Sequence, residues 1–360
     1  MRGEGENFLS TCLKGASQVF FMENAITGAL FLVAIFYASF VTGVWATSIG
    51  AVIGVVVATA VASALSFDEK ARLSGLFGFN GILIGLALPT FVATSPTLWL
   101  YIIVGAALST IVTAAFAATL TKSWGVPGST GPFVLSAWLL LAGAYSLGSL
   151  RVLSETQKLV TDYQLGTAVL PGLVEGGEIF FRNIGQVYLL GSWVSGAIIL
   201  LGIFIASRPA GVAAAAGSLL AMGTAFVMRP DPALVSQGLY GFSPVLTAMA
   251  LSVVFVQTSP LVIGYAALGV VVAVFLQAAF DLILAPIGLP SFTAAYVLTM
   301  YLFIAPRKFA PPHPHKPVAA HPLKPGDHEP AGSGPIPTAE KPSREAGSPR
   351  DVSSALPLHS

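Results

Sequence analysis

The chain has 360 residues, of which 55% are hydrophobic and only 9% are charged, and its formal net charge is +1. Soluble domains carry roughly 25% charged residues, so this composition excludes a mainly water-facing surface and predicts a protein of the lipid bilayer. The small net charge gives no sign of nucleic-acid binding, and the single cysteine, Cys12, excludes an intramolecular disulfide.

The first half of the chain consists of long uncharged runs separated by single charges. A membrane-spanning helix needs ~20 mostly apolar residues. Residues 24–67 and 73–121 contain no Asp, Glu, Lys or Arg, and each run is long enough for two spans, with the first turn predicted near 46–48. Residues 123–150 supply one further span. We therefore predict a first membrane repeat of five spans at residues 1–150.

The second half has the same number of predicted spans. A polar connector is predicted at 151–182, and a second membrane repeat at 183–306. The uncharged runs of this repeat are 183–207, 209–228, 232–280 (two spans) and 282–306. From residue 307 onward the chain is rich in proline and histidine and cannot bury a core, so residues 307–360 are predicted to form a disordered tail.

The positions of lysine and arginine near the span ends predict the orientation, because cytoplasmic loops carry an excess of both. With a cytoplasmic N-terminus, the residues that fall inside are Lys14, Lys70, Arg72, Lys122, Arg208, Arg307 and Lys308. Those that fall outside are Arg151, Lys158, Arg182 and Arg229, which lie mostly near the connector. This distribution predicts a multi-pass protein of the cell inner membrane with both termini in the cytoplasm.

Three blocks of sequence occur twice in the same order. Residues 75–88 (GLFGFNGILIGLAL) match residues 238–251 (GLYGFSPVLTAMAL) at an offset of 163 positions, and residues 125–140 match 288–303 at the same offset. A further block at 16–36 matches 184–204 at an offset of 168. Because five spans are an odd number, the second copy must enter the membrane in the opposite orientation. We therefore predict an all-α integral membrane protein of two inverted repeats, whose transport site lies at their interface.

The matched blocks place glycine, proline and small polar residues inside apolar runs, as in GFNG at 78–81 and VPGSTGP at 126–132. Within a bilayer, irregular backbone is tolerated where it is buried in protein or lines a wet cavity, which predicts re-entrant or half-spanning helices around a central pore. The alternative interpretation is close helix packing through small residues. Matched breaks in both halves favour the pore.

Three pairs of matched side chains are candidates to line such a pore. Gln18 and Gln186 open apolar runs and offer uncharged donors and acceptors; alternatively, they face lipid headgroups. Phe79 and Phe242 could form flat walls for a planar solute, although phenylalanine in membrane helices usually packs or faces lipid. Thr130 and Thr293 follow helix breaks, and their ordinary role would be as caps or as backbone-bonded hydroxyls. These residue types suit a polar, neutral solute.

Missing residue types exclude other functions. All five histidines lie at positions 313, 315, 321, 328 and 359, in the predicted tail. The membrane part therefore offers no catalytic set for an enzyme, no histidine relay and no metal or cofactor site. Glu23 and Asp281 are the candidate acids for an ion-coupled transporter, but their matched positions hold Gly191 and Ala118. A neutral permeant is favoured, with a receptor or scaffold role left open.

At these residues the chain resembles the urea transporter family. The block GLFGFNGILIGLAL is similar to that family's signature, and its second copy, the two proline–threonine segments and the doubled Gln-Val segments occur in the family's order across about residues 12–306. The resemblance implies a homotrimer in membrane lipid, in which each protomer passes urea through its own channel of two five-helix repeats. It implies passive transport.

The resemblance also implies a selectivity filter with particular side chains. Its polar residues would be Gln18 and Gln186, and its aromatic walls would be Phe21, Phe79 and Phe242. Its central constriction would consist of Val19, Val187, Leu83, Leu246, Thr130 and Thr293. Substrate-binding positions are therefore expected, and catalytic residues are not.

Two positions depart from the family pattern. Leu189 stands where the first repeat has Phe21, so one aromatic wall becomes aliphatic, and the second signature reads GFSP, with Pro244 near the start of a helix. The first departure leaves open a channel that also passes short amides, ammonia or water. The lack of paired NPA sequences argues against a water channel.

Overall fold

The computed structural model describes residues 7–153, 158–162 and 171–306, and its regular structure there is helical apart from an isolated bridge between Val92 and Val152. All of these residues lie in the first of two units into which the chain divides, Met1–Lys324. The second unit, Pro325–Ser360, and the predicted tail at 307–360 lie outside the described residues.

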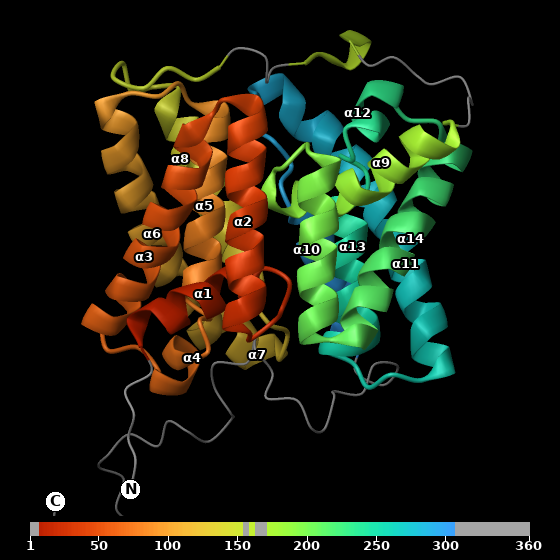
Figure 1. Ribbon diagram of the computed structural model, residues 1–360, viewed down its shortest axis with the longest axis horizontal. Coiled ribbons are helices and arrows are strands. Elements are labelled where there is room, and N and C mark those ends of the chain that lie inside the picture. The colour runs from red at the N-terminus through yellow and green to blue at the C-terminus, as the bar shows by residue number, and fades with distance from the viewer. Residues whose placement is uncertain (1–6, 154–157, 163–170, 307–360) are drawn as a thin grey trace, which may run out of the picture. The chain divides into compact units, whose positions relative to one another are not determined.

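The first repeat contains long helices, short apolar helices and small connecting helices (Figure 1). In chain order they are α1 (Phe8–Gln18), α2 (Ala25–Thr42), α3 (Trp45–Ala64), α4 (Glu69–Leu73), α5 (Gly78–Phe91), α6 (Pro96–Phe116), the π-helix η1 (Ala117–Thr121), α7 (Lys122–Trp124) and α8 (Gly131–Ala144).

The second repeat has the same order of elements. After a 3₁₀ turn, η3 (Val160–Asp162), come α9 (Leu173–Gly185), η4 (Gln186–Tyr188), α10 (Trp193–Ala206), α11 (Arg208–Met228), α12 (Pro232–Ser236), α13 (Phe242–Met249), the π-helix η5 (Ala250–Val254), α14 (Pro260–Leu284), η6 (Ala285–Ile287) and α15 (Ala294–Ile304). The α9 helix begins inside the stretch assigned to the connector, and the domain boundaries remain a prediction.

Five helices of the described chain are long and apolar enough to cross a bilayer. They are Ala25–Thr42, Trp45–Ala64, Pro96–Trp124, Arg208–Met228 and Pro260–Ile287. A sixth span forms if Leu173–Tyr188 and Trp193–Ala206, which meet at 75°, count as one. The other uncharged runs fold into shorter apolar helices, namely Gly78–Phe91, Gly131–Ala144, Phe242–Val254 and Ala294–Ile304.

These short helices confirm the predicted half-spanning helices and correct only the number of full spans. At 1.5 Å per residue, the 14 residues of α5 extend only about 21 Å, less than the ~30 Å hydrocarbon core. Gly75 and Ser129 take left-handed backbone just before α5 and α8, where these helices begin. The break predicted at 126–132 is therefore found, whereas residues 78–81 are helical and the break comes before them, at Gly75. The turn predicted near 46–48 is also displaced. The α2 helix ends at Thr42, where Gly43 adopts the left-handed conformation common after helix ends (φ 72°).

The two repeats have the same backbone turns. Among the described residues, all left-handed positions except Gly43 pair at the offsets of the sequence repeat: Phe21 with Leu189, Ser66 with Arg229, Gly75 with Gly238, Gly125 with Gly288, and Ser129 with Phe292. In Figure 1, α1, α4 and α7 lie toward the lower end, whereas α9 and α12 lie toward the upper end. The second repeat is therefore an inverted copy of the first.

The interface between the repeats is reciprocal, as expected for elements related by a twofold axis. The Thr27 hydroxyl in α2 donates to the Gly202 carbonyl in α10 at 3.0 Å, and the Ser195 hydroxyl in α10 donates to the Ala34 carbonyl in α2 at 2.9 Å. Thr27 matches Ser195, and Ala34 matches Gly202. The same contact is thus made twice, which places α2 and α10 around a pseudo-twofold axis.

Glycines allow α3 and α5 to pack with their backbones in contact. A Cβ atom on Gly85 would lie 2.0 Å from the Gly50 carbonyl oxygen, and one on Gly54 would lie 2.2 Å from the Gly81 carbonyl oxygen. Small residues spaced four apart permit such close approach between membrane helices. The packing interpretation of the glycines is therefore correct at this interface, alongside the helix breaks.

Candidate solute pathway

Each glutamine of the matched pair sits where a short helix ends in a left-handed turn. Phe21 and Leu189 have φ values of 63° and 59°, and their amides donate to the carbonyls of Gln18 and Gln186, each at 2.9 Å. The two turns are built alike, although one carries an aromatic side chain and the other an aliphatic one. Phenylalanine and leucine therefore occupy equivalent places.

The two glutamine amides are held in the same way. Gln18 Nε2 donates to the Ser74 carbonyl at 2.8 Å, and Gln186 Nε2 donates to the Gln237 carbonyl at 2.9 Å. A carbonyl can only accept, so it fixes which end of the amide faces it. Within the described part of the chain, neither Oε1 atom has a hydrogen-bond donor. Both amides therefore have an oxygen that no other described residue engages.

The two matched threonines meet at the junction of the repeats. Thr293 Oγ1 donates to Thr130 Oγ1 at 2.7 Å, and both side chains are buried. Each threonine immediately precedes a short helix, α8 or α15. Residues next to them are also in contact across the junction, since the Ser129 and Tyr296 hydroxyls are 2.7 Å apart and the Phe133 and Phe292 rings are 4.9 Å apart. These two contacts are related by the repeat.

A cavity of about 220 Å³ is lined mainly by the second repeat, with Phe91 and Phe133 of the first repeat on its wall. Its walls include four of the predicted filter residues, Gln186, Val187, Phe242 and Thr293, together with Leu189. A smaller cavity of about 30 Å³ lies in the first repeat and contains Phe79.

The two cavities occupy equivalent places in the repeats. Their linings share matched positions: Ala71 and Leu234, Leu76 and Leu239, Phe79 and Phe242, Gly128 and Ser291, Ser129 and Phe292. Thr293 lines the larger cavity, while Ser129, the neighbour of Thr130, lines the smaller one. The threonine pair therefore lies between two cavities that are related by inversion.

The remaining predicted residues line neither cavity. Val19, Leu83 and Leu246 are fully buried in the core, and Gln18 is 3% exposed. Phe21 packs against other rings, with its centroid 5.4 Å from that of Phe255 and 6.1 Å from that of Tyr296. The structure thus brings four predicted filter residues of the second repeat to one cavity, while those of the first repeat are packed more tightly.

Sequence reasoning missed two buried amides beside the cavities. Asn80 Nδ2 donates to Thr113 Oγ1 at 2.9 Å, and Asn80 Oδ1 accepts from the Phe133 amide at 3.2 Å. The matched Ser243 is too short to make these contacts and instead donates to Gln277 Oε1 at 2.9 Å. The exchange of Asn80 for serine in the second signature was a visible signal that another polar group must compensate.

Gln277 connects further polar groups at the larger cavity. Its Nε2 atom donates to Ser291 Oγ at 2.6 Å and to Asp281 Oδ1 at 3.0 Å. Asp281, the candidate acid of the second repeat, lines this cavity from the last turns of α14, and Lys158 also lines it. Among the residues that the structure describes, no three His, Cys, Asp or Glu side chains form a cluster that could hold a metal ion.

Two inverted repeats with half-length helices, and with cavities at matched places on either side of their junction, define a multi-pass membrane transport protein. Comparison with known proteins specifies which one. A family model described as "Urea transporter" matches residues 9–308, and the chain belongs to the urea transporter family.

Curated relatives agree with this assignment. The chain is 30% identical over 306 residues to urea transporter 1 of Capra hircus, and the match covers 82% of this chain and 76% of the relative. It is 28% identical over 308 residues to urea transporter 1 of Rattus norvegicus, with the same coverage of both chains. The sequence-based prediction of the family is confirmed.

Proposed function

We propose that this protein conducts urea passively across the membrane, along a path from the larger cavity, past Thr130 and Thr293, to the smaller one. Family membership identifies the solute. The observation that supports this path is the hydrogen bond between the two threonines, which lies between cavities lined by matched positions of the two repeats. The path would cross the pseudo-twofold axis at the threonine pair, because this axis exchanges the two cavities, so both repeats would contribute equivalent groups.

The chemistry of urea suits these groups. Urea is planar and uncharged, with four N–H donors and one carbonyl acceptor. Stripping such groups of water without new partners costs several kcal/mol. The Oε1 atoms of Gln18 and Gln186 and the two threonine hydroxyls would accept N–H bonds, while Phe79 and Phe242 would hold the plane of the molecule.

The threonine pair acts as the central exchange point in this proposal. A hydroxyl is both donor and acceptor, so the bond between Thr130 and Thr293 can be replaced by bonds from each hydroxyl to urea. Around them, Val19, Val187, Leu83 and Leu246 would form an aliphatic constriction that offers nothing to a hydrated ion. Conduction requires that binding be weak enough for release, and replacing one hydrogen bond by another meets that need.

The second repeat supports a broader choice of solute. Its cavity is the larger of the two, and Leu189 stands at the position of the aromatic Phe21. An aliphatic wall constrains a planar solute less than a ring does, so short amides are the second candidate for passage. Ammonia and water would require no wall at all.

The assembly and its placement are also part of the proposal. We infer a homotrimer in the cell inner membrane, with one path in each protomer and both termini in the cytoplasm. The family resemblance supports the trimer, and the distribution of lysine and arginine supports the orientation. The absence of a nucleophile–base set from the membrane sequence supports a non-enzymatic role.

Stopped-flow measurement of urea flux in proteoliposomes tests this proposal. Flux well above that of empty liposomes, and equal with and without sodium or proton gradients, is the expected result. Flux that follows either gradient would replace the channel by a coupled transporter, with Glu23 and Asp281 as the leading sites. Flux equal to that of empty liposomes would remove urea as the solute.

A further inference from the structure

A cationic side chain stands one helical turn before each glutamine. Lys14 precedes Gln18 in α1, and Arg182 precedes Gln186 at the end of α9. Lys14 and Arg182 are matched at the same offset of 168 positions as the glutamines themselves. Residues four apart lie on one face of a helix, so each cation and its glutamine are directed toward the same neighbouring element.

Both cations reach equivalent carbonyls. Lys14 Nζ donates to the Leu73 carbonyl at 3.4 Å, and Arg182 Nη1 donates to the Ser236 carbonyl at 3.0 Å. Leu73 ends α4, and Ser236 ends α12. The glutamines take the next carbonyls along the chain, those of Ser74 and Gln237. In each repeat, a cation and an amide thus bind consecutive carbonyls where the short helix ends.

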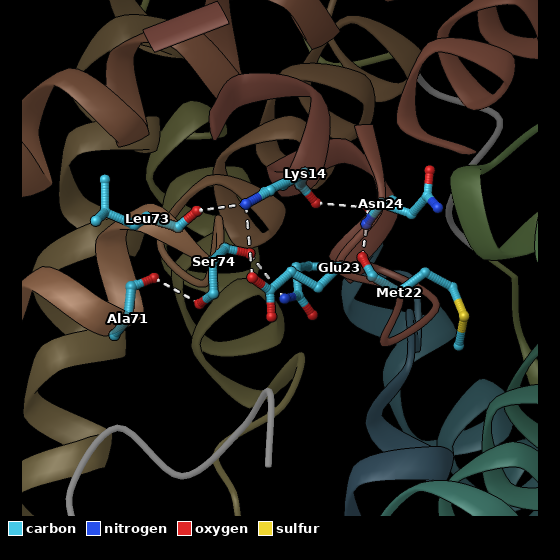
Figure 2. A network of polar contacts seen from close by, with 9 residues as sticks. Lys14, Met22, Glu23, Asn24, Ala71, Leu73 and Ser74 are labelled. Carbon is cyan, nitrogen blue, oxygen red and sulfur yellow. Dashed lines mark hydrogen bonds and ion pairs between the residues drawn. The ribbon is translucent and has the colours of Figure 1, made fainter. Parts of the chain in front are cut away.

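The acidic partners of the two cations differ. Lys14 Nζ lies 3.6 Å from Glu23 Oε1, on the segment after α1, and Figure 2 shows Lys14 between Leu73 and Glu23. Arg182 Nη2 instead lies 2.7 Å from Glu178 Oε2, within α9 itself. What the repeats share is therefore the contact between the cation and the carbonyl, not the ion pair. Because the contact between cation and carbonyl occurs in both repeats although the acidic partners differ, it points to a role for the cation at the glutamine.

The physical role follows from the donors and acceptors at this place. Carbonyls at a helix end have no partner within the helix, and a cation is favoured there. If the cation is removed, the carbonyl of Leu73 or Ser236 lacks its donor, and the glutamine Nε2 can turn to it. The glutamine side-chain amide would then rotate, so that its Oε1 atom would no longer point in one fixed direction.

We propose that Lys14 and Arg182 are positioning residues for the solute: each fixes the glutamine amide of its repeat so that Oε1 is presented to urea. This inference rests on the proposed function. It assigns a task to two charged side chains that never need to touch the solute. It also explains why a lysine and an arginine can serve equally, because both donate to a single carbonyl.

A double-mutant cycle tests the coupling in each repeat. Urea flux in proteoliposomes is measured for Lys14→Met, Gln18→Ala and the double variant, and likewise for Arg182→Met and Gln186→Ala. We expect each single change to lower flux by about tenfold, as loss of one good hydrogen bond would. In the background lacking the glutamine, loss of the cation should lower flux by less than about twofold, since the two residues act as a unit.

Three further variants separate positioning from general stability. Lys14→Arg and Arg182→Lys should keep flux within about twofold of the wild type, because each restores the donor found in the other repeat. Lys70→Met, on the exposed side of α4, is the matched control and should leave flux unchanged. All variants are compared at equal amounts of reconstituted protein, and each must elute at the volume of the wild type. Because each repeat has its own cycle, a variant that does not fold in one repeat leaves the cycle in the other repeat as a test.

The outcomes are distinct. Single and double losses that multiply independently, in a wild type that conducts urea, would overturn the positioning role and leave the proposed function intact. Failure of Lys14→Arg and Arg182→Lys to conduct would also overturn it. A wild type without urea flux would overturn the proposed function and this inference with it.

Discussion

Leu189 stands where the first repeat has the ring of Phe21, and the backbone conformation of the turn bears on this difference. Leu189 and Phe21 share the left-handed backbone, with φ values of 59° and 63°. A side chain at φ > 0 is strained, yet Phe21 shows that a ring is accommodated in this turn. The leucine is therefore a change in the wall of the cavity rather than a requirement of the backbone.

We predict that Leu189→Phe raises the permeability ratio of urea to acetamide by roughly three- to tenfold, because a second ring would favour the flat solute over one carrying a methyl group. Permeability to both solutes is measured by stopped flow in the same liposomes. Phe21→Leu is the matched control and should lower the ratio. Equal permeability ratios in the wild type and both variants would show that positions 21 and 189 do not determine selectivity between urea and acetamide.

Asn80 and Ser243 show how a change at one residue was compensated elsewhere. Asn80 is fully buried and links Thr113 to the Phe133 amide. In the second repeat, Gln277 supplies the amide that Ser243 lacks. The position matching Gln277 is Ala114, on α6.

Removing the amide of Asn80 should therefore destabilise the fold. Asn80→Ala leaves the Phe133 amide without its acceptor, which costs about 1–3 kcal/mol, and Asn80→Ser should cost nearly as much. Adding Ala114→Gln to Asn80→Ser should recover part of the loss. The midpoint of thermal unfolding in detergent reports the effect, and a double variant no more stable than Asn80→Ser would contradict the account.

At the scale of elements, the position of α5 depends on very close backbone contacts with α3. The α3 and α5 helices touch through backbone at Gly50 and Gly85, with no room for a methyl group. The α5 helix carries Phe79, Asn80 and Leu83, so its distance from α3 sets their positions. Packing between α3 and α5 therefore controls the positions of these side chains.

Gly85→Ala should force α3 and α5 apart, because its Cβ would lie 2.0 Å from the Gly50 carbonyl oxygen. We expect a loss of about 1–3 kcal/mol of stability or more and a fall in the yield of folded protein, measured by size exclusion in detergent. Gly264→Ala in α14 is the control, since no atom of a neighbouring element lies within 4 Å of the place its methyl group would take. A Gly85→Ala protein with wild-type yield and melting would show that the two helices can separate freely.

Much of this arrangement could be predicted from the sequence, and the reasons are specific. Long uncharged runs predicted α2, α3, α6, α11 and α14, since lipid imposes both length and composition. The matched blocks predicted the inverted repeat. Glycine and proline inside the other runs predicted half-spanning helices. Hydropathy could not show where these helices begin, because Gly75 and Ser129 turn the chain through their backbone conformation.

The candidate site was only partly predictable. Matching residue types found Gln186, Phe242 and Thr293, which the structure brings to one cavity. It did not find Gln277, which has no polar counterpart in the first repeat, nor the pairing of Lys14 with the Leu73 carbonyl. Those contacts join segments distant in the chain, and no local pattern encodes them.

At the scale of the whole molecule, the inverted repeat brings Thr130 and Thr293 together where the two copies meet. The reciprocal bonds of Thr27 and Ser195 tie α2 to α10, and the bond between Thr130 and Thr293 lies between the two cavities. The cavities themselves differ, at about 220 and 30 Å³. The backbone is therefore symmetric, while the side chains make the two halves of the path unequal.

The measurement that tests the central claim most directly is urea flux through Thr130→Val with Thr293→Val. Valine keeps the shape of threonine and removes the hydroxyl, so the doubled variant should elute like the wild type. We predict that its urea flux falls by about tenfold or more, because urea would lose both exchange partners at the centre. Folded variant protein that conducts urea as fast as the wild type would contradict a path between the two threonines.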